Sequence, residues 1–473
     1  MEYMAPFTVR FSQGSDSPCQ ELVAGKHFHL GLDAMEQLFW TNLSPRLRDF
    51  LRVAISVYVA DRLGRRKQQS QERRWFRSLK LSVAVREPEF WESGEVLATL
   101  MECLDFLSED AWDLKFVKDY REQPTYVARF LPGDNPFAAV KPLVCLYSGG
   151  LDSAAGLGIR IAENPDRPVI PVTVWHQPGQ RQIVRRQQGV LKARYGTPIY
   201  PLIVKAAMVW SSELKEWKPE RSQRCRSFLF AAVGAVAAVI SEATKVEVFE
   251  SGIGAINLPL LAGMVGSRAT RGSHPHFFHL MSRLASLATG QEVAFHLPFI
   301  EKTKGQVVRQ LARCGLKDLA RSTISCVHYP LRERPHKQCG ICPACLLRRQ
   351  AMLIAGIKEP SGVYKYDLFG PAPRANRIRE DRLEYLKAIL VQVANLGPLG
   401  SGDRVPERVR RHLLGTNVIS PGECLDPFIH LFSRYRHEWL RIAAKGMERG
   451  WTWANLLAPV GAALIGRENH ASA

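Results

Sequence analysis

Residues 142–162 read PLVCLYSGGLDSAAGLGIRIA. An apolar run at 142–147 precedes a turn with two glycines, and a segment rich in small residues follows at 152–162. This pattern predicts a strand, a loop and a helix in that order. Glycines let backbone N–H groups approach an anion closely, and the helix directs the positive end of its dipole to the same place. The stretch therefore predicts a phosphate-binding loop.

The predicted loop also carries polar side chains that suit a nucleotide. The hydroxyls of Ser148 and Ser153 can donate hydrogen bonds, and Asp152 can hold Mg²⁺ that bridges phosphates. The GK[ST] ending of a Walker loop is missing, which disfavours γ-phosphoryl transfer. An ordinary strand–turn–helix junction is the alternative interpretation. We assign nucleotide binding to Ser148, Gly149, Gly150, Leu151, Asp152 and Ser153.

Strands and helices alternate through the rest of the middle region. Apolar runs predict further strands at 168–175, 198–204 and 246–249, and helices are expected at 181–195 and 227–242. This rhythm is typical of an α/β fold with a parallel sheet covered by helices. Ligands bind such sheets at the carboxyl ends of the strands, where the predicted loop also lies.

The length of 473 residues predicts two or three domains. We place an α+β extension at 1–140, with strands at 28–30 and 80–85 and a helix at 47–63. The catalytic core is predicted at 141–358. A helical extension is predicted at 359–473, with helices at 377–393 and 430–449.

Four cysteines are clustered with the spacing of a metal site. Cys339, Cys342 and Cys345 form a double C-x-x-C, and Cys326 lies upstream. Four thiolates can close a tetrahedron around Zn²⁺, which predicts a structural zinc site. An iron–sulfur cluster is an alternative, and His328 or His336 could replace one thiolate. Lys337, Arg348 and Arg349 would offset the negative charge of the cluster.

The chain is basic, with 64 Lys and Arg against 45 Asp and Glu, a formal charge of +19. This excess suits either nucleic acid or ATP together with an acidic protein partner. The longest apolar run, 228–240, is too short to span a bilayer and predicts a buried helix. The N-terminus does not have the pattern of a signal peptide, so we expect a cytoplasmic protein without a membrane partner.

In full, SGGLDS resembles the ATP-pyrophosphate loop of PP-loop enzymes, which cleave ATP between the α and β phosphates. It is followed in order by GQRQ (179–182), CRS (225–227), TKG (303–305) and SC…CGICPACLLR (325–348). This series resembles the QueC family of 7-cyano-7-deazaguanine synthases over about residues 142–358. The resemblance implies ATP, Mg²⁺ and Zn²⁺ as cofactors and a deazapurine carboxylate, activated as its adenylate and passed to ammonia.

The resemblance also implies roles for single residues. Asp152 and Lys304 would be catalytic, and Arg181 and Arg226 would contact the substrate anion. The segment ESGIGAINLP (250–259) and the His-Pro segment near 274 depart from the usual synthase pattern and are similar to longer PP-loop relatives. In them, Glu250 and Asn257 would contact the nucleotide or the base, and Arg271 and His274 the substrate carboxylate.

The layout as a whole resembles the QueC-like component of bacterial anti-phage systems, the QatC type, in which both extensions flank such a core. The activated acid could then pass to an amine of a partner protein, held by the extensions. Two other functions stay open at this point. One is a PP-loop enzyme that modifies tRNA or a base, and the other is a scaffold that senses a nucleotide without turnover.

Overall fold

The computed structural model describes residues 7–13, 19–39, 43–66, 77–120, 137, 139–175, 179–209, 214, 219–220, 222–258, 271–331, 336–396, 407–418 and 424–457. The chain forms two compact units. Unit 1 comprises Met1–Ser148, Asn164–Val248 and Gly266–Leu297, and unit 2 comprises Gly149–Glu163, Phe249–Val265 and Pro298–Ala473. The chain first passes from unit 1 to unit 2 between Ser148 and Gly149, inside the predicted phosphate loop.

Unit 1 contains a six-stranded sheet in the order β10-β9-β6-β7-β8-β3. Five of its strands are parallel: β6 (Leu143–Leu146), β7 (Val169–Trp175), β8 (Leu202–Met208), β9 (Lys245–Glu247) and β10 (Ala294–His296). β3 (Phe28–Leu30) closes one edge antiparallel to β8. The predicted α/β fold with a parallel sheet is confirmed, and the strand predicted at 28–30 belongs to that same sheet.

A second sheet of four strands lies in the same unit, in the order β2-β1-β4-β5. It consists of β1 (Thr8–Gln13), β2 (Gln20–Val23), β4 (Ser78–Val85) and β5 (Ala111–Lys118). Buried and exposed side chains alternate in the first half of β4, as expected of a strand with one face on the core. The strand predicted at 80–85 is therefore confirmed within β4.

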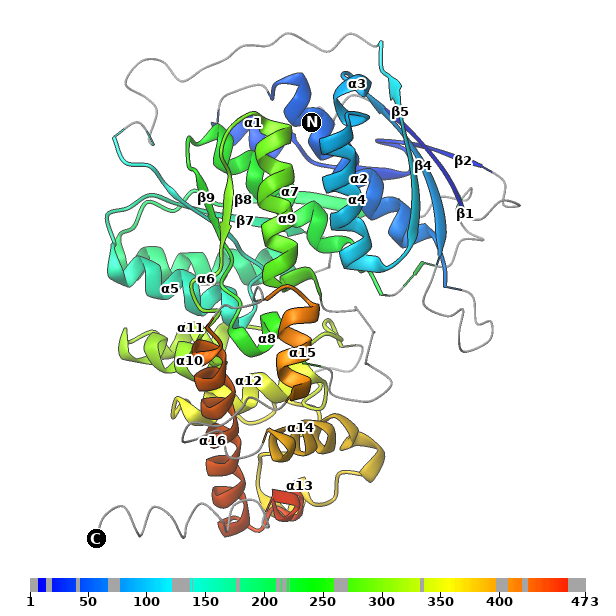
Figure 1. Ribbon diagram of the computed structural model, residues 1–473. Coiled ribbons are helices and arrows are strands. Elements are labelled where there is room, and N and C mark those ends of the chain that lie inside the picture. The colour runs from blue at the N-terminus through cyan, green and yellow to red at the C-terminus, as the bar shows by residue number, and fades with distance from the viewer. Residues whose placement is uncertain are drawn as a thin grey trace. The chain divides into compact units, whose positions relative to one another are not determined.

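Helices fill the space between these two sheets (Figure 1). α2 (Pro45–Leu63) begins at the N-cap Ser44 and contacts both β4 and α7 (Arg226–Ile240). α7 in turn contacts β6, β7 and β9. A side chain at Gly234 of α7 would come within 2.7 Å of Leu146, so glycine allows the helix to lie close to β6.

The other helices of unit 1 are α1 (Asp33–Phe39), α3 (Pro88–Trp91), α4 (Gly94–Ser108), α6 (Gln180–Tyr195), η4 (Arg271–Ser273) and α9 (Pro275–Thr289). The apolar run 228–240 is the buried part of α7, as predicted. None of the described helices is long and apolar enough to cross a membrane.

Unit 2 is helical. Its helices are α5 (Leu151–Glu163), α8 (Gly252–Ile256), α10 (Lys304–Arg313), α11 (Lys317–Ser322), α12 (Pro343–Ile354), α13 (Ala372–Ala375), η5 (Glu380–Arg382), α14 (Glu384–Asn395), α15 (Glu407–Gly415), α16 (Asp426–Glu448) and η6 (Thr452–Leu457). α10 packs on both α5 and α12, and α12 packs on α14 and α16. The helices after residue 358 therefore share one packed unit with α5 and α10.

Some boundaries differ from the predictions. The strand expected at 198–204 is β8 at 202–208, because Pro198 and Pro201 have no N–H to donate to a ladder. The helix expected from 377 begins at Glu384 after a separate 3₁₀ turn at Glu380–Arg382. The predicted domain boundaries at 140 and 358 stay predictions.

Candidate nucleotide site and cysteine cluster

The glycine loop has the backbone conformation that its sequence predicts. Gly149 has φ +79°, in the left-handed region that favours glycine, and α5 begins two residues later at Leu151. The carbonyl of Gly150 accepts hydrogen bonds from Ala154 N (3.0 Å) and Ser153 Oγ (3.1 Å). The positive end of α5 is thus formed by the residues predicted to bind phosphate.

Asp152 and Lys304 are brought together in unit 2, as a shared site requires. Lys304 is the first residue of α10, and its Nζ donates a hydrogen bond to Asp152 Oδ2. Both side chains are largely buried, with 11% of the Lys304 and 16% of the Asp152 side chain exposed. Asp152 Oδ1 is buried and has no hydrogen-bond partner among the described residues. An orphaned carboxylate oxygen at a helix N-terminus fits a Mg²⁺ ligand.

The side chain of Glu250 lies beside the Asp152–Lys304 pair. Its Oε1 lies 4.0 Å from Lys304 Nζ. A Cβ at Gly254 would come within 2.2 Å of Glu250 Oε1, so glycine leaves the space that this side chain occupies. Burial and the Asp152 carboxylate raise the pKa of Glu250 to about 8, and Lys304 opposes the rise.

Lys304 stays charged in this setting. Burial would lower its pKa, but the carboxylates of Asp152 and Glu250 reverse the effect and raise it. An ammonium group that stays charged beside Asp152 can counter the charge of a polyphosphate.

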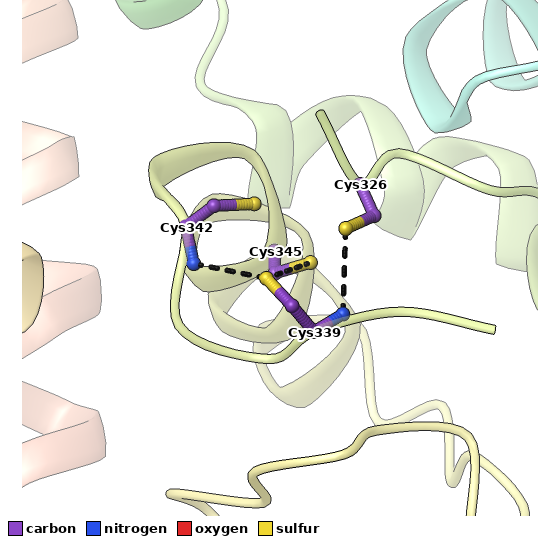
Figure 2. A group of neighbouring side chains, drawn as sticks. All are labelled: Cys326, Cys339, Cys342 and Cys345. Carbon is purple, nitrogen blue, oxygen red and sulfur yellow. Dashed lines mark hydrogen bonds between the residues drawn. The ribbon is translucent and has the colours of Figure 1, made fainter. Parts of the chain in front are cut away.

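The four cysteines converge in unit 2, with all four sulfur atoms within 4.8 Å of one another (Figure 2). Cys339 Sγ lies 3.9 Å from Cys345 Sγ. Four thiolates about 2.3 Å from a zinc ion would be about 3.8 Å apart, so this arrangement fits tetrahedral Zn²⁺. Among the described residues this is the group that could hold a metal, and His328 and His336 are not part of it. His336 Nδ1 lies instead 2.9 Å from the carbonyl oxygen of Gly362.

Local structure explains how the cysteines are held. The N–H of Cys339 donates to Cys326 Sγ (3.3 Å), and the N–H of Cys342 donates to Cys339 Sγ (3.4 Å). Gly340 has φ +85°, and a Cβ there would come within 1.9 Å of the Tyr366 carbonyl oxygen. The turn between the first two ligands therefore requires glycine.

The basic residues beside the cluster bind carboxylates. Arg348 is 1% exposed and pairs with Glu359 at 2.9 Å, and its Nη1 also donates to Thr323 Oγ1. Arg349 pairs with the same Glu359 and with Asp367. These ion pairs are with carboxylates and not with the cysteine sulfurs. For these described residues, the structure therefore shows no direct ion pair between Arg348 or Arg349 and the cysteine cluster.

A short segment connects the cysteine cluster to the glycine loop. The N–H of Ile324 donates to the Gly149 carbonyl, and the N–H of Leu151 donates to Ser325 Oγ, each at 3.4 Å. Cys326 is the next residue along the chain. Ser325 N is fixed in turn by Gln338 Oε1 at 3.1 Å. Ser325 was missed as a site residue, because its contact with Leu151 joins positions 174 apart.

The four predicted substrate residues lie in unit 1. Arg181 is exposed on α6, and Arg226 begins α7 with its guanidinium 5.7 Å from the Phe230 ring. Arg271 stacks on Phe106 at 4.6 Å and donates to its carbonyl at 3.4 Å. His274 is the buried N-cap of α9, with its Nδ1 accepting from His276 N. Arg271 and His274 thus meet at Phe106, while the substrate roles of all four stay predictions.

Comparison with known proteins bears on the middle of the chain. Residues 272–356 match the family model described as queuosine biosynthesis protein QueC. The 7-cyano-7-deazaguanine synthase of Methylobacillus flagellatus is 26% identical over 234 residues, which is 47% of this chain and 95% of that enzyme.

Two more relatives are also 7-cyano-7-deazaguanine synthases. The 7-cyano-7-deazaguanine synthase of Paramagnetospirillum magneticum is 26% identical over 233 residues, 47% of this chain and 98% of that enzyme. The synthase of Anaeromyxobacter sp. is 37% identical over 92 residues, 18% of this chain and 37% of that enzyme. Residues 272–356, which include the four cysteines, are thus similar to the QueC family, and the chain is similar to 7-cyano-7-deazaguanine synthases.

Proposed function

We propose that this chain is an ATP-dependent enzyme that activates a carboxylate like that of 7-carboxy-7-deazaguanine. A carboxylate oxygen attacks the α-phosphorus of ATP, the bond to the β-phosphate oxygen breaks, and pyrophosphate leaves. An amine nitrogen then attacks the acyl carbon, AMP leaves with the electron pair, and the nitrogen releases a proton to solvent. The observation that carries this proposal is the Asp152–Lys304 pair at the N-terminus of α5.

The residues of unit 2 have separable roles in this scheme. The N–H groups at the start of α5 bind phosphate oxygens, and Lys304 stabilises the charge that develops on the leaving pyrophosphate. Asp152 would hold Mg²⁺, which neutralises phosphate charge when bound. The four thiolates would hold Zn²⁺ in a closed site that supplies structure rather than catalysis. The cysteines form no disulfide bonds in the described structure, which suits the reducing cytoplasm.

The direct test is product formation from Mg-ATP and 7-carboxy-7-deazaguanine, with and without ammonia. We expect AMP and pyrophosphate to form only with the acid, and Asp152→Ala to abolish both. Asp166→Ala, an exposed position just after the same helix, is the matched control. ATP binding without pyrophosphate release would contradict the proposal and support a nucleotide-sensing scaffold.

For the acceptor we propose an amine of a partner protein, in an anti-phage system of the QatC type, with ammonia as the simpler alternative. A protein amine is chemically equivalent to ammonia as a nucleophile, and the chain carries long segments on both sides of its QueC-like part. Mass spectrometry of a candidate partner protein, incubated with enzyme, ATP and the acid, tests this. An unchanged mass while AMP accumulates would contradict a protein acceptor.

A nucleic-acid acceptor is the second candidate, and one observation favours it. Residues 167–212, which include β7, α6 and β8, contain seven Lys and Arg and not one Asp or Glu. The cations on α6 are exposed: Arg181, Arg185, Arg186, Lys192 and Arg194. A helix face with this charge suits a phosphate backbone.

RNA binding measured across a range of salt concentrations separates the two candidates. Neutralising two phosphate contacts should reduce the slope of log K against log salt by about 2. We expect this of Arg185→Gln combined with Arg186→Gln if RNA is the acceptor. Lys80→Gln with Lys118→Gln removes the same charge from exposed positions of β4 and β5. Equal slopes for both double variants would exclude α6 as an RNA surface.

A further inference from the structure

Helix α16 places a buried carboxylate at the start of the helix that carries Lys304. Glu438, in the middle of α16, is 8% exposed. Its Oε1 accepts a hydrogen bond from Thr303 Oγ1 at 2.6 Å, and its Oε2 accepts one from Gln350 Nε2 at 2.5 Å. Burying a carboxylate is costly unless such donors compensate it, so an apolar side chain would be the cheaper way to fill this space.

Thr303 is the residue through which this carboxylate reaches the site. It is fully buried and forms the N-cap of α10, in a capping box where its Oγ1 accepts from Gln306 N and Gln306 Oε1 accepts from its own N–H. Lys304 follows directly, and its Nζ holds Asp152. The donor hydrogen of Thr303 is given to Glu438, so the cap has a fixed rotamer.

The packing around this carboxylate is close. A Cβ at Gly305, the second residue of α10, would come within 2.6 Å of Glu438 Oε1. A Cβ at Gly252, the first residue of α8, would come within 2.6 Å of Leu431 Cδ2 on the same helix α16. α16 therefore approaches both segments that hold the charges of the site, at Gly305 beside Lys304 and at Gly252 two residues after Glu250.

The helix that supplies these contacts lies outside the recognised family segment, which ends at residue 356. We infer that Glu438 is a positioning residue for the nucleotide site, and that the region after residue 358 completes this site by fixing the N-terminus of α10. The inference rests on the proposed function for its kinetic readout, and on the structure alone for its nucleotide-binding readout.

Three variants test the inference in the full-length protein. Glu438→Gln keeps the shape of the side chain but turns an NH₂ group toward Thr303 or Gln350. We expect kcat for AMP formation to fall about tenfold or more and the affinity for ATP to fall, while KM for the acid changes less than twofold. Glu448→Gln makes the same substitution at an exposed position of the same helix, and its kcat and ATP affinity should match those of the wild type.

The second arm separates the packing around Glu438 from its hydrogen bond to Thr303. Gly305→Ala alone should abolish AMP formation, because its methyl group meets the Glu438 carboxylate. Adding Glu438→Ala makes room for that methyl group but removes the acceptor of the Thr303 hydroxyl, so the melting temperature should recover while kcat stays at least tenfold below that of the wild type. Thermal unfolding of each variant, followed by circular dichroism, identifies any that fail to fold.

The possible outcomes are distinct. Wild-type kcat and ATP affinity in Glu438→Gln, or wild-type kcat in the Gly305→Ala, Glu438→Ala double variant, would overturn the inference. If the wild type forms no AMP from the deazapurine acid, the proposed function fails. In that case ATP affinity still decides the role of Glu438, with weaker binding in Glu438→Gln supporting it and equal binding refuting it.

Discussion

Lys304 pairs with the Asp152 carboxylate and lies 4.0 Å from the Glu250 carboxyl group. Replacing it with Met leaves Asp152 without its counter-ion and removes the cation that holds this residue of the glycine loop. We expect Lys304→Met to lower the rate of AMP formation by about 100-fold or more, as removal of a charge-stabilising donor does in other enzymes. The variant should also unfold at a lower temperature, because a buried ion pair is broken.

The measurement is AMP release under saturating ATP, together with thermal unfolding. Lys317→Met, at an exposed position at the start of α11, is the control for loss of one positive charge. A rate within twofold of the wild type would show that Lys304 does not act on the nucleotide.

A second prediction at this scale concerns a buried acid far along the chain from the loop. Asp49 on α2 is fully buried, and its Oδ2 accepts from the N–H groups of Arg86 and Glu87. Burial raises its pKa from the ordinary 3.8 to about 6, although Arg52 and the two N–H groups oppose the rise. The folded protein thus binds this proton more tightly than the unfolded chain does.

The stabilising contribution of Asp49 is therefore complete below about pH 4 and is lost as the pH rises to about 6. Asp49→Asn keeps an oxygen acceptor for both N–H groups and does not titrate. We expect the variant to lose part of the decline in melting temperature between pH 4 and pH 6. Asp113→Asn, exposed on β5, should keep the wild-type profile. Identical profiles for Asp49→Asn and the wild type would contradict the assignment.

At the scale of elements, the best predictions came from local signals. The strand–loop–helix at 142–162 and the cysteine spacing each lie within a few residues, so their chemistry can be read without a fold. Glu438 and Ser325 gave no such signal, because their partners Thr303 and Leu151 are 135 and 174 positions away. Contacts of this kind become visible only when the packing of helices is known.

The turn at Gly340 allows a test of the cysteine cluster as an element. Gly340→Ala adds a methyl group that would meet the Tyr366 carbonyl oxygen, which should push Cys339 and Cys342 apart. We expect zinc affinity to fall about tenfold or more, measured by competition with a chelator. Gly362→Ala is the control, since φ there is also positive, +80°, but no atom lies within 4 Å of the added Cβ. Equal loss in both variants would show that backbone strain alone is responsible.

At the scale of the molecule, the N-terminal strands and helices are part of unit 1 rather than an attachment to it. β3 pairs with β8 of the parallel sheet, and α2 packs on α7. The sequence predicted these elements but not their place, since pairing of strands so far apart leaves no local pattern. The long-range order of the two sheets could therefore not be derived from periodicity.

Removal of residues 1–66 tests this arrangement. The shortened chain would lose β1, β2, β3, α1 and α2, so the side of α7 that packs on α2 would face water. We expect a product that is insoluble, or that binds a hydrophobic dye and unfolds without a cooperative transition. A soluble product with the wild-type melting curve would show that the remaining chain folds by itself.

Hydrogen bonds join Ile324 and Ser325 to the glycine loop, and Cys326 of the cysteine cluster follows directly in the chain. The cluster and the loop are therefore connected through three consecutive residues. Ligands at two sites joined in this way can be thermodynamically linked, and any such linkage is reciprocal. If zinc orders the loop and thereby tightens ATP binding, ATP must slow the loss of zinc by the same factor in affinity. A cell rich in ATP would then protect this enzyme during zinc starvation, and a fall in ATP would release zinc and inactivate it.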